Sequence, residues 1–243
     1  MIYVVGMGPG AEEQMTGQAI KALEDSDVII GYPVYTELLG ARFREKEFKT
    51  TPMRQEIERC RMCFEEALKG RKVSMLCSGD AGIYGMASLL YELKAEYPPQ
   101  EGLEIQVIPG ITAASSGGAI LGAPIGHDFC VISLSDLLTP WEVIGKRLRA
   151  AADGDFAIVI YNPSSRRRAD HLQRACDILL EKLSPQTCCG YVENIGRDGT
   201  RYETCTLAEL RECRVNMFTT VFIGNSRSRL IDGKLITGRG YRI

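Results

Sequence analysis

The sequence predicts an α/β fold that is organised as two α/β domains. Apolar strands alternate with amphipathic helices, and most strands break into glycine-rich or polar turns. Strands that are apolar throughout and lie between helices are typical of a mostly parallel sheet with both faces covered. The length of 243 residues fits one large domain or two small ones.

The first half of the chain alternates strands and helices in regular order. We expect helices near residues 16–24, 54–69 and 85–97, with Thr16 as a cap or first-turn residue of the first. The expected strands are 2–5, 28–30, "KVSMLCSGD" at 72–80 and "EIQVIPG" at 104–110.

The segment "GITAASSGGAILGAPIG" at 110–126 is rich in Gly, Ala and Ser, and it begins a second unit. That unit carries the strand-like runs "DFCVISLSD", "DFAIVIYNP", "TCCGYVENIG" and "MFTTVFIGN", with helices near 141–151 and 169–181. The sequence shows no internal repeat. We therefore expect an N-terminal domain at 1–112 and a C-terminal domain at 113–243.

The composition excludes several classes of protein. A net charge of −2 and a pI near 5.9 argue against a general nucleic-acid binder. No apolar run reaches the roughly 20 residues that span a bilayer. The N-terminus lacks the basic start of a signal peptide, so we expect a cytoplasmic protein.

The nine cysteines form no disulfide framework and suit a reducing compartment. Cys60 and Cys63 form a C-x-x-C on one face of an expected helix. With no second pair at ligand spacing, we expect no metal site, and helix packing explains this pair better than a metal or redox role.

The opening "VVGMGPGA" fits the permissive dinucleotide-binding pattern Gly6-x-Gly8-x-x-Ala11, but three details argue against that function. Pro9 has no N–H to offer a phosphate, and the first helix is expected to begin several residues too late. The second strand also ends in Gly31-Tyr32 and not in the acid that holds a ribose hydroxyl.

Four turns follow apolar strands, where ligands bind in open α/β sheets: "CSGDAGIYG", "VIPGITAAS", "VIYNPSSRRR" and "FIGNSRSR". Singly, each could be an ordinary strand-to-helix turn. Asp80 follows its strand directly and could cap the next helix or face a cationic ligand group. No lysine follows these glycines, so the turn is not a P-loop.

Together, "VVGMGPG", "SGDAGIYGMA", "GHDFCVISLSD", "LTPWE" and "IYNPSSRRR" resemble the tetrapyrrole (corrin/porphyrin) methylase family, and in particular its members that methylate C17 in cobalamin biosynthesis. The resemblance implies the tetrapyrrole methylase fold, that of class III S-adenosylmethionine methyltransferases: two α/β domains with an active-site trough between them. It also implies a homodimer, S-adenosylmethionine as cofactor with S-adenosylhomocysteine as product, and a precorrin or cobalt-precorrin substrate.

The resemblance also implies which residues meet the methyl donor. They are Pro9, Gly79, Asp80, Ile83, Tyr84, Thr112, Ala113, Tyr161, Asn162, Glu193, Asn194, Gly224 and Asn225. In the family the GxGPG turn closes a wall of the cleft and cradles no pyrophosphate, so Gly8 lies on the substrate side and Pro9 is tolerated.

The family's C17 member also contracts the ring, and this step moves protons. Of the two histidines, His127 beside Asp128 is the candidate acid or base, with a hydrogen-bonded turn as the equal alternative. His171 is expected on a solvated helix face. Ser133, Ser135 and Asp136 interrupt an apolar strand and could face the substrate.

Two arginine clusters follow predicted strand ends, and arginine forks suit the carboxylates of a tetrapyrrole. Of these, Arg166 and Arg167 are the substrate-binding candidates. Methylation at another corrin position, or a module that binds a tetrapyrrole or nucleotide without catalysis, stays open. The sequence also leaves open whether the substrate carries cobalt.

Overall fold

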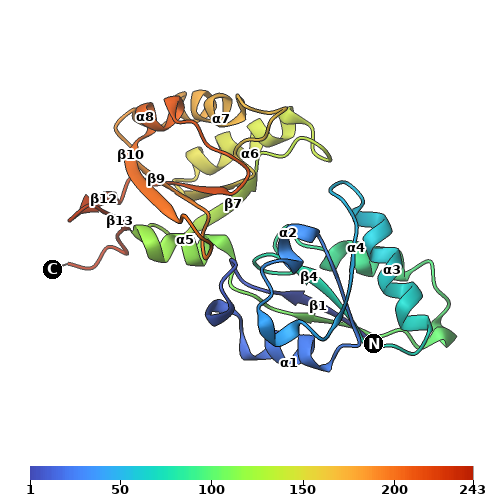
Figure 1. Cartoon of the computed structure of the whole chain (residues 1–243). Helices are drawn as coiled ribbons and strands as arrows, with labels where there is room; N and C mark the ends of the chain where they lie inside the picture. The colour runs from blue at the N-terminus through green and yellow to red at the C-terminus, as the bar shows by residue number, and fades with distance from the viewer. Residues whose placement is uncertain (243) are drawn as a thin grey trace. The chain divides into compact units, whose positions relative to one another are not determined.

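The computed structural model describes residues 1–242, and the chain forms two compact units, Met1–Thr112 and Ala113–Ile243. Both units are layered α/β structures, which confirms the predicted fold class (Figure 1). No helix within residues 1–242 combines the length and the apolar character that a bilayer span requires.

Unit 1 is built on a five-stranded sheet of order β3-β2-β4-β1-β5 in which every pair is parallel. Its strands are β1 (Ile2–Gly6), β2 (Val28–Gly31), β3 (Glu47–Thr50), β4 (Val73–Cys77) and β5 (Ile105–Ile108). Its helices are α1 (Gly17–Asp25), α2 (Pro33–Thr36), α3 (Glu56–Leu68) and α4 (Ala87–Lys94), with 3-10 turns at Glu12–Gln14, Ala41–Phe43 and Pro99–Glu101.

Both faces of this sheet are buried. Alternate residues of β1 enter different cores: Val4 packs with α3 and α4, whereas Val5 packs with α1. The strands therefore read as continuous apolar runs. The five strands also end at one edge, so the turns that follow β1, β4 and β5 come together there.

Unit 2 is built on a second five-stranded sheet, of order β10-β9-β11-β8-β7. Its strands are β7 (Phe129–Ser133), β8 (Ala157–Tyr161), β9 (Cys188–Glu193), β10 (Arg201–Thr206) and β11 (Thr219–Ile223). Its helices are α5 (Ala113–Leu121), α6 (Trp141–Asp153), α7 (His171–Leu180) and α8 (Leu207–Glu212). A small sheet adds β6 (Gly122–Ala123), β12 (Ser228–Ile231) and β13 (Lys234–Thr237).

Strand direction differs between the two large sheets. In the large sheet of unit 2 only β7 and β8 pair in parallel, while β11 runs antiparallel to both β8 and β9. As a result β7, β8 and β9 all end at one edge, which we call the carboxyl edge, and β11 begins there. We call the opposite edge the amino edge.

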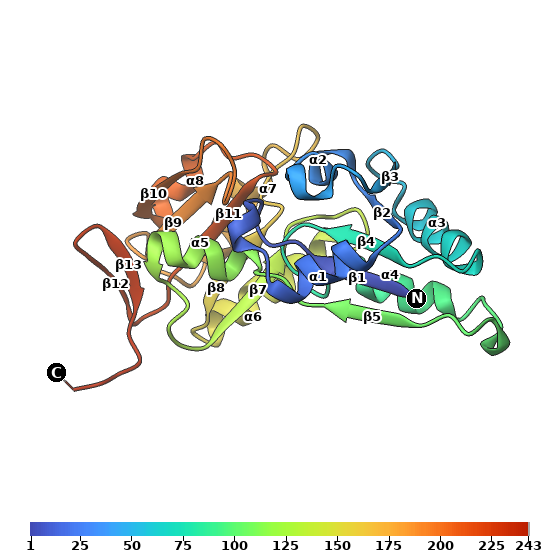
Figure 2. The same cartoon turned by 60° about the horizontal axis from the view of Figure 1, so that its bottom comes forward.

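Helices cover both faces of the unit 2 sheet (Figures 1 and 2). Helices α6, α7 and α8 bury the larger core on one face, and α5 packs on the other with Leu235 of β13. The small residues of α5 allow a close approach: a Cβ at Gly117 would lie 2.9 Å from Ile195 and 3.1 Å from Phe222. This explains the Gly/Ala/Ser-rich start of the unit.

Candidate functional site

The turns after β1 and β4 of unit 1 are joined by their glycines. Gly8 N–H donates to the carbonyl of Gly79 at 3.0 Å, and Gly79 N–H donates back to Gly8 at 2.7 Å. Both residues have positive φ, +78° and +67°, which glycine adopts without strain. The glycines of these two motifs therefore join the β1 and β4 turns by a pair of backbone hydrogen bonds at the strand ends.

The turn after β5 packs into the same place. A Cβ at Gly110 would lie 2.2 Å from the carbonyl oxygen of Gly79 and 2.5 Å from that of Gly6. No real side chain fits at such distances, so three turns meet here as bare backbone. We call Gly6, Gly79 and Gly110 the glycine contact.

Asp80 braces the glycine contact from one side. Its Oδ1 accepts from Gly82 N–H at 2.8 Å, and its Oδ2 accepts from Gly110 N–H at 2.9 Å. Helix α4 begins later, at Ala87, without a side-chain cap. The helix-cap alternative for Asp80 is therefore wrong, and its carboxylate ties the β4 turn to the β5 turn.

The donor candidates around the brace differ in exposure. Pro9 is buried, whereas Ile83 and Tyr84 lie exposed in the turn after Asp80, with Tyr84 at φ +55°. Helix α1 begins only at Gly17, with the Thr16 hydroxyl accepting from Ala19 N–H. This late start confirms the reason for rejecting a dinucleotide site.

In unit 2 the carboxyl edge brings together several predicted site residues. Asn162 follows β8 with φ +52° and donates from Nδ2 to the Ser133 hydroxyl at 2.9 Å. The Tyr161 hydroxyl accepts from Ala114 N–H at 2.8 Å, directly after Thr112-Ala113 at the start of α5. Ends of β7, β8 and α5 are thus fixed to one another.

The environment of His171, at the start of α7, differs most from the sequence prediction. His171 opens α7 but is only 3% exposed, so its assignment to a solvated face is wrong. Its Nδ1 lies 2.9 Å from the carbonyl oxygen of Leu134, and its Nε2 lies 3.6 Å from Oδ2 of Asp136. The spacing of His171, Ala175 and Leu179, each four residues apart on the buried face, is the signal that would have found it.

Arg168 binds the same loop from the opposite direction. Its Nη1 donates to the Ser135 hydroxyl at 2.7 Å and lies 3.6 Å from Oδ1 of Asp136, while its Nε donates to Ser165 at 3.0 Å. Two backbone hydrogen bonds between Ser165 and Arg168 close a tight turn. Arg166 and Arg167 occupy the tip of this turn and are exposed.

Glu193 and Asn194 also lie at the carboxyl edge, at the end of β9, but their groups are engaged. Glu193 is buried, with Oε2 bound by Arg201 at 2.6 and 2.8 Å and Oε1 bound by Asn216. Asn194, at φ +54°, accepts from Thr200 through its carbonyl oxygen at 2.7 Å. Both residues shape the 194–200 loop.

The amino edge of unit 2 holds four further candidates from the sequence. They lie at the opposite edge of the sheet from the candidates of the carboxyl edge, so the structure does not bring the two sets together. His127 and Asp128 precede β7, and Gly224 and Asn225 follow the antiparallel strand β11. The intervening strand, Phe129–Ser133, spans about 13 Å at 3.3 Å per residue.

The bonds at the amino edge are those of turns. Asp128 N–H donates to His127 Nδ1 at 2.7 Å, and Asn225 Nδ2 donates to the carbonyl of Asp155 at 2.9 Å. Two hydrogen bonds from Ser226 lower the pKa of the Asp155 carboxyl, with smaller contributions from Arg227 and His127.

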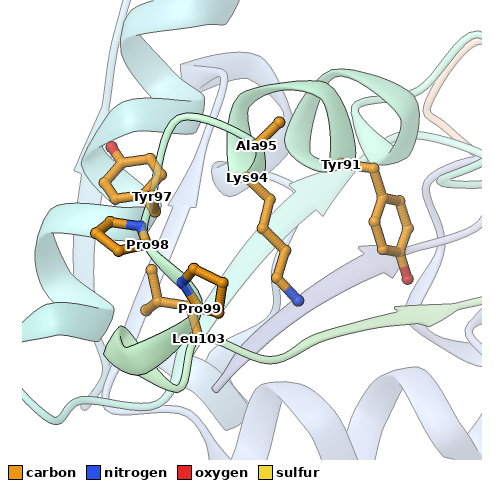
Figure 3. A pocket seen from close by; sticks show the side chains of 7 residues that line it. All are labelled: Tyr91, Lys94, Ala95, Tyr97, Pro98, Pro99 and Leu103. Atoms are coloured by element: carbon orange, nitrogen blue, oxygen red, sulfur yellow. The ribbon is translucent and has the colours of Figure 1, made fainter.

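A hollow of about 490 Å³ on unit 1 lies away from the turns of the glycine contact. It is formed by the segment between α4 and β5, at the opposite end of the sheet from the glycine contact (Figure 3). Its lining residues are Tyr91, Lys94, Ala95, Tyr97, Pro98, Pro99 and Leu103. None of them is a candidate from the sequence.

The cysteines are packing residues. Cys60 and Cys63 are fully buried in the core between α3 and the sheet, and burial raises the pKa of the Cys60 thiol to about 12. Within residues 1–242, no three His, Cys, Asp or Glu side chains gather into a cluster that could hold a metal ion.

Comparison with known proteins adds an independent line of evidence. Residues 1–211 match the family described as Tetrapyrrole (Corrin/Porphyrin) Methylases. A probable cobalt-factor III C(17)-methyltransferase of Salmonella typhimurium is 45% identical over 243 residues, covering 100% of both chains. A precorrin-3B C(17)-methyltransferase of Sinorhizobium sp is 36% identical over 95% of this chain and 91% of its own.

Solved structures agree with this result. The crystal structure of the methyltransferase CobJ superposes with a TM-score of 0.90 at 36% identity, covering 98% of this chain and 99% of that one. A uroporphyrin-III C-methyltransferase of Thermus thermophilus, complexed with S-adenosyl homocysteine, shares the fold with a TM-score of 0.71 at 20% identity, covering 92% of this chain and 96% of that one.

Proposed function

The chain belongs to the tetrapyrrole (corrin/porphyrin) methylase family, and from this premise we propose that it methylates C17 of a cobalt-containing tetrapyrrole in cobalamin biosynthesis. S-adenosylmethionine is the proposed methyl donor, and S-adenosylhomocysteine the product. The observation that carries the proposal is the 45% identity, over the full length of both chains, with the cobalt-factor III relative.

The choice of a cobalt-containing substrate follows from the same comparison. Identity falls from 45% with the cobalt-factor III relative to 36% with the precorrin-3B relative. The reduced cysteines agree with a reducing compartment. A cobalt-free precorrin is therefore the competing substrate, and contraction of the macrocycle accompanies methylation in this proposal.

Unit 1 offers a chemically suitable place for the donor. The glycine contact packs three turns together without side chains, so the ends of β1, β4 and β5 present backbone and not bulky side chains there. Asp80 adds a carboxylate for a sulfonium or an ammonium, since each of its oxygens retains a lone pair after accepting one N–H. The exposed Ile83 and Tyr84 supply apolar surface for an adenine ring.

Unit 2 offers groups suited to the acidic rim of a tetrapyrrole. Arg166 and Arg167 stand at the tip of a turn held by Ser165 and Arg168, so two guanidinium groups are presented on a fixed base. Guanidinium groups bind carboxylates with two parallel hydrogen bonds. We assign these two arginines to substrate recognition and Arg168 to holding the loop.

Bound S-adenosylmethionine would supply an electrophilic methyl group, and the chain's task is alignment of the receiving carbon with it. The donor contacts are expected from the glycine contact, Asp80 and the Thr112-Ala113 start of α5, together with Tyr161-Asn162. Glu193, Asn194, Gly224 and Asn225 have their groups engaged in turns, so we expect at most backbone contacts from them.

The decisive experiment compares the two substrates directly. The purified protein is incubated with S-adenosylmethionine carrying an isotopically labelled methyl group and with either the cobalt-containing or the cobalt-free tetrapyrrole. We expect mass spectrometry to show one labelled methyl group on the cobalt-containing product, and NMR to place it at C17. Methylation of the cobalt-free substrate alone, or at another carbon, would contradict the proposal.

A pair of variants tests the substrate side. Arg166→Gln with Arg167→Gln should raise KM for the tetrapyrrole and leave donor affinity unchanged, whereas Lys146→Gln on the exposed face of α6 removes a charge elsewhere. Light scattering tests the homodimer that the family implies. Cell fractionation tests the cytoplasmic location that the sequence predicts. An unchanged KM in the double variant would remove the two arginines from the site.

A further inference from the structure

The carboxyl edge of unit 2 places a buried histidine next to a partly exposed carboxylate, and we call these two residues the Asp136–His171 couple. His171 is 3% exposed, yet it faces a carboxylate that is 37% exposed and open to a ligand. A buried histidine could be satisfied by a carbonyl alone. Here the second ring nitrogen is aimed at Asp136, which the sequence had marked as a substrate-facing candidate.

The hydrogen bonds fix which nitrogen carries the proton. The carbonyl oxygen of Leu134, 2.9 Å from Nδ1, can only accept, so Nδ1 carries the hydrogen. In the neutral ring Nε2 is then an unprotonated base, 3.6 Å from Oδ2 of Asp136. The protein thus holds one defined tautomer with its basic nitrogen next to an accessible carboxylate.

Other charged groups around the couple are few. Arg168 lies 3.6 Å from the other oxygen of Asp136, with its closer bonds made to Ser135 and Ser165. The Trp141 ring packs against the imidazole at a tilt of 51° with 4.6 Å between centroids, and the Arg174 guanidinium lies over the Trp141 ring, 4.0 Å from its centroid. Each carboxylate oxygen of Asp136 therefore has one basic group 3.6 Å away, Arg168 at Oδ1 and His171 at Oδ2.

Methyl transfer creates a demand for such a couple. The bond between sulfur and the methyl carbon breaks, a carbon–carbon bond forms, and the positive charge of the sulfonium passes to the macrocycle. The methylated macrocycle returns to its original charge only by releasing one proton. A base that can reach the bound substrate is therefore needed.

We propose that Asp136 accepts this proton and that His171 is the positioning residue that shares it through Nε2. The inference rests on the proposed methyl transfer. It places proton acceptance at the carboxyl edge, with Ser133 and Asn162, and not at His127 on the amino edge. His171 itself touches no substrate and acts through Asp136.

The competing explanation is that His171 only anchors the loop to α7 through Leu134. Two amide variants separate these roles. In His171→Asn the amide nitrogen can replace Nδ1 and keep the bond to Leu134, but nothing reaches Asp136. In His171→Gln the longer amide can reach Asp136 and gives up the bond to Leu134. An anchoring role predicts that the Asn variant is active, and the couple predicts that it is impaired.

The kinetic test uses Asp136→Asn, His171→Asn, His171→Gln and the control Asp153→Asn, an exposed acid at the end of α6. We expect Asp136→Asn to lower kcat roughly 100-fold or more, with donor affinity and KM little changed. His171→Asn should lower kcat on the order of 10- to 100-fold and alter the acid limb of the pH–rate profile, with partial rescue in His171→Gln. Wild-type kcat and an unchanged profile in both Asn variants would overturn the proposal.

A spectroscopic test works without turnover. The chain has only two histidines, so His127→Gln leaves His171 alone in the side-chain ¹⁵N spectrum. We expect the Nδ1–H tautomer, and a changed Nε2 chemical shift in Asp136→Asn, because the carboxylate next to that nitrogen is gone. An Nε2 chemical shift that is the same with and without the Asp136 carboxylate would refute the couple even if the protein methylated no tetrapyrrole. Wild-type protein that fails to methylate, with a normal spectrum, would reject the proposed function alone.

Discussion

Asp80 has two proposed roles that can be measured separately: it stabilises the fold by joining two turns, and it contributes to binding of the methyl donor. The perturbation is Asp80→Asn, which keeps the shape of the side chain and removes its charge. Asparagine has one acceptor oxygen, so either Gly82 or Gly110 loses its acceptor and faces an NH₂ group instead.

The size of the effect follows from these two bonds. A hydrogen bond to a charged group contributes about 1.5–3 kcal/mol to stability, and this site is partly exposed, so the lower value applies to the lost bond. With the weaker remaining bond, we expect Asp80→Asn to cost ~2 kcal/mol and Asp80→Ala, which loses both bonds, ~3 kcal/mol. For a cooperative unit of 150–250 residues, 2 kcal/mol lowers Tm by roughly 4–8 °C.

The assay is urea unfolding followed by circular dichroism, with calorimetric titration of S-adenosylmethionine on the folded variants. The exposed Asp198→Asn is the charge-matched control and should shift neither measurement. We expect stability to fall in the order wild type, Asn, Ala, with donor affinity falling as well. An unfolding midpoint in Asp80→Ala equal to that of the wild type would refute the brace between the β4 and β5 turns.

Three further perturbations probe other contacts. Gly110→Ala places a Cβ 2.2 Å from the Gly79 carbonyl oxygen, so it should lower the free energy of unfolding in urea by ~3 kcal/mol and weaken donor binding. The control Gly17→Ala has open space around its Cβ and should change neither property. Equal behaviour of the two variants would contradict the glycine contact. Hydrogen bonds from Lys49 and Lys69 lower the pKa of buried Glu66 to about 2, so its contribution to stability is present above pH 4.5 and is lost as the pH falls toward 2. In acid unfolding, Glu66→Gln should be less stable by ~3 kcal/mol at pH 7 and lose this pH dependence; the same acid midpoint in both proteins would contradict it. Tyr161→Phe removes the acceptor of Ala114 N–H, so hydrogen exchange at Ala114 should speed up by a factor of about 5, for ~1 kcal/mol; unchanged protection would show that the hydroxyl contributes nothing.

Much of the fold could be predicted because most strands are buried on both faces. Runs such as β4, with every residue buried, are apolar apart from Ser74, and Thr16 before α1 is a typical cap. The predicted boundaries therefore fall within a few residues of those observed. The strands missed in the large sheets, Glu47–Thr50 and Arg201–Thr206, are outermost strands of their sheets. Edge strands are half-exposed and polar, so their sequences resemble loops.

Strand direction and the environment of a side chain were harder to predict from the sequence. The antiparallel course of β11 separates Asn225 from Asn162, and no local pattern encodes the direction in which a strand enters a sheet. For His171 the neighbouring charges suggested solvent, although its position on α7 lies above Ala175 and Leu179. A polar residue on the apolar face of a helix needs a hydrogen-bond partner, which here is the carbonyl of Leu134, with Asp136 next to the other ring nitrogen.

Each unit contains buried cysteine thiols whose reactivity reports local unfolding of that unit. Cys60, Cys63 and Cys77 belong to unit 1, and Cys176, Cys189 and Cys205 to unit 2, while the three half-buried cysteines all lie in unit 2. Burial raises the pKa of Cys63 and of Cys189 well above the ordinary value for a thiol, so a disulfide reagent meets a reactive thiolate only after local unfolding. Labelling rates, read by peptide mass, would then report the opening equilibria of the two units separately in the unmodified protein, with no engineered probe.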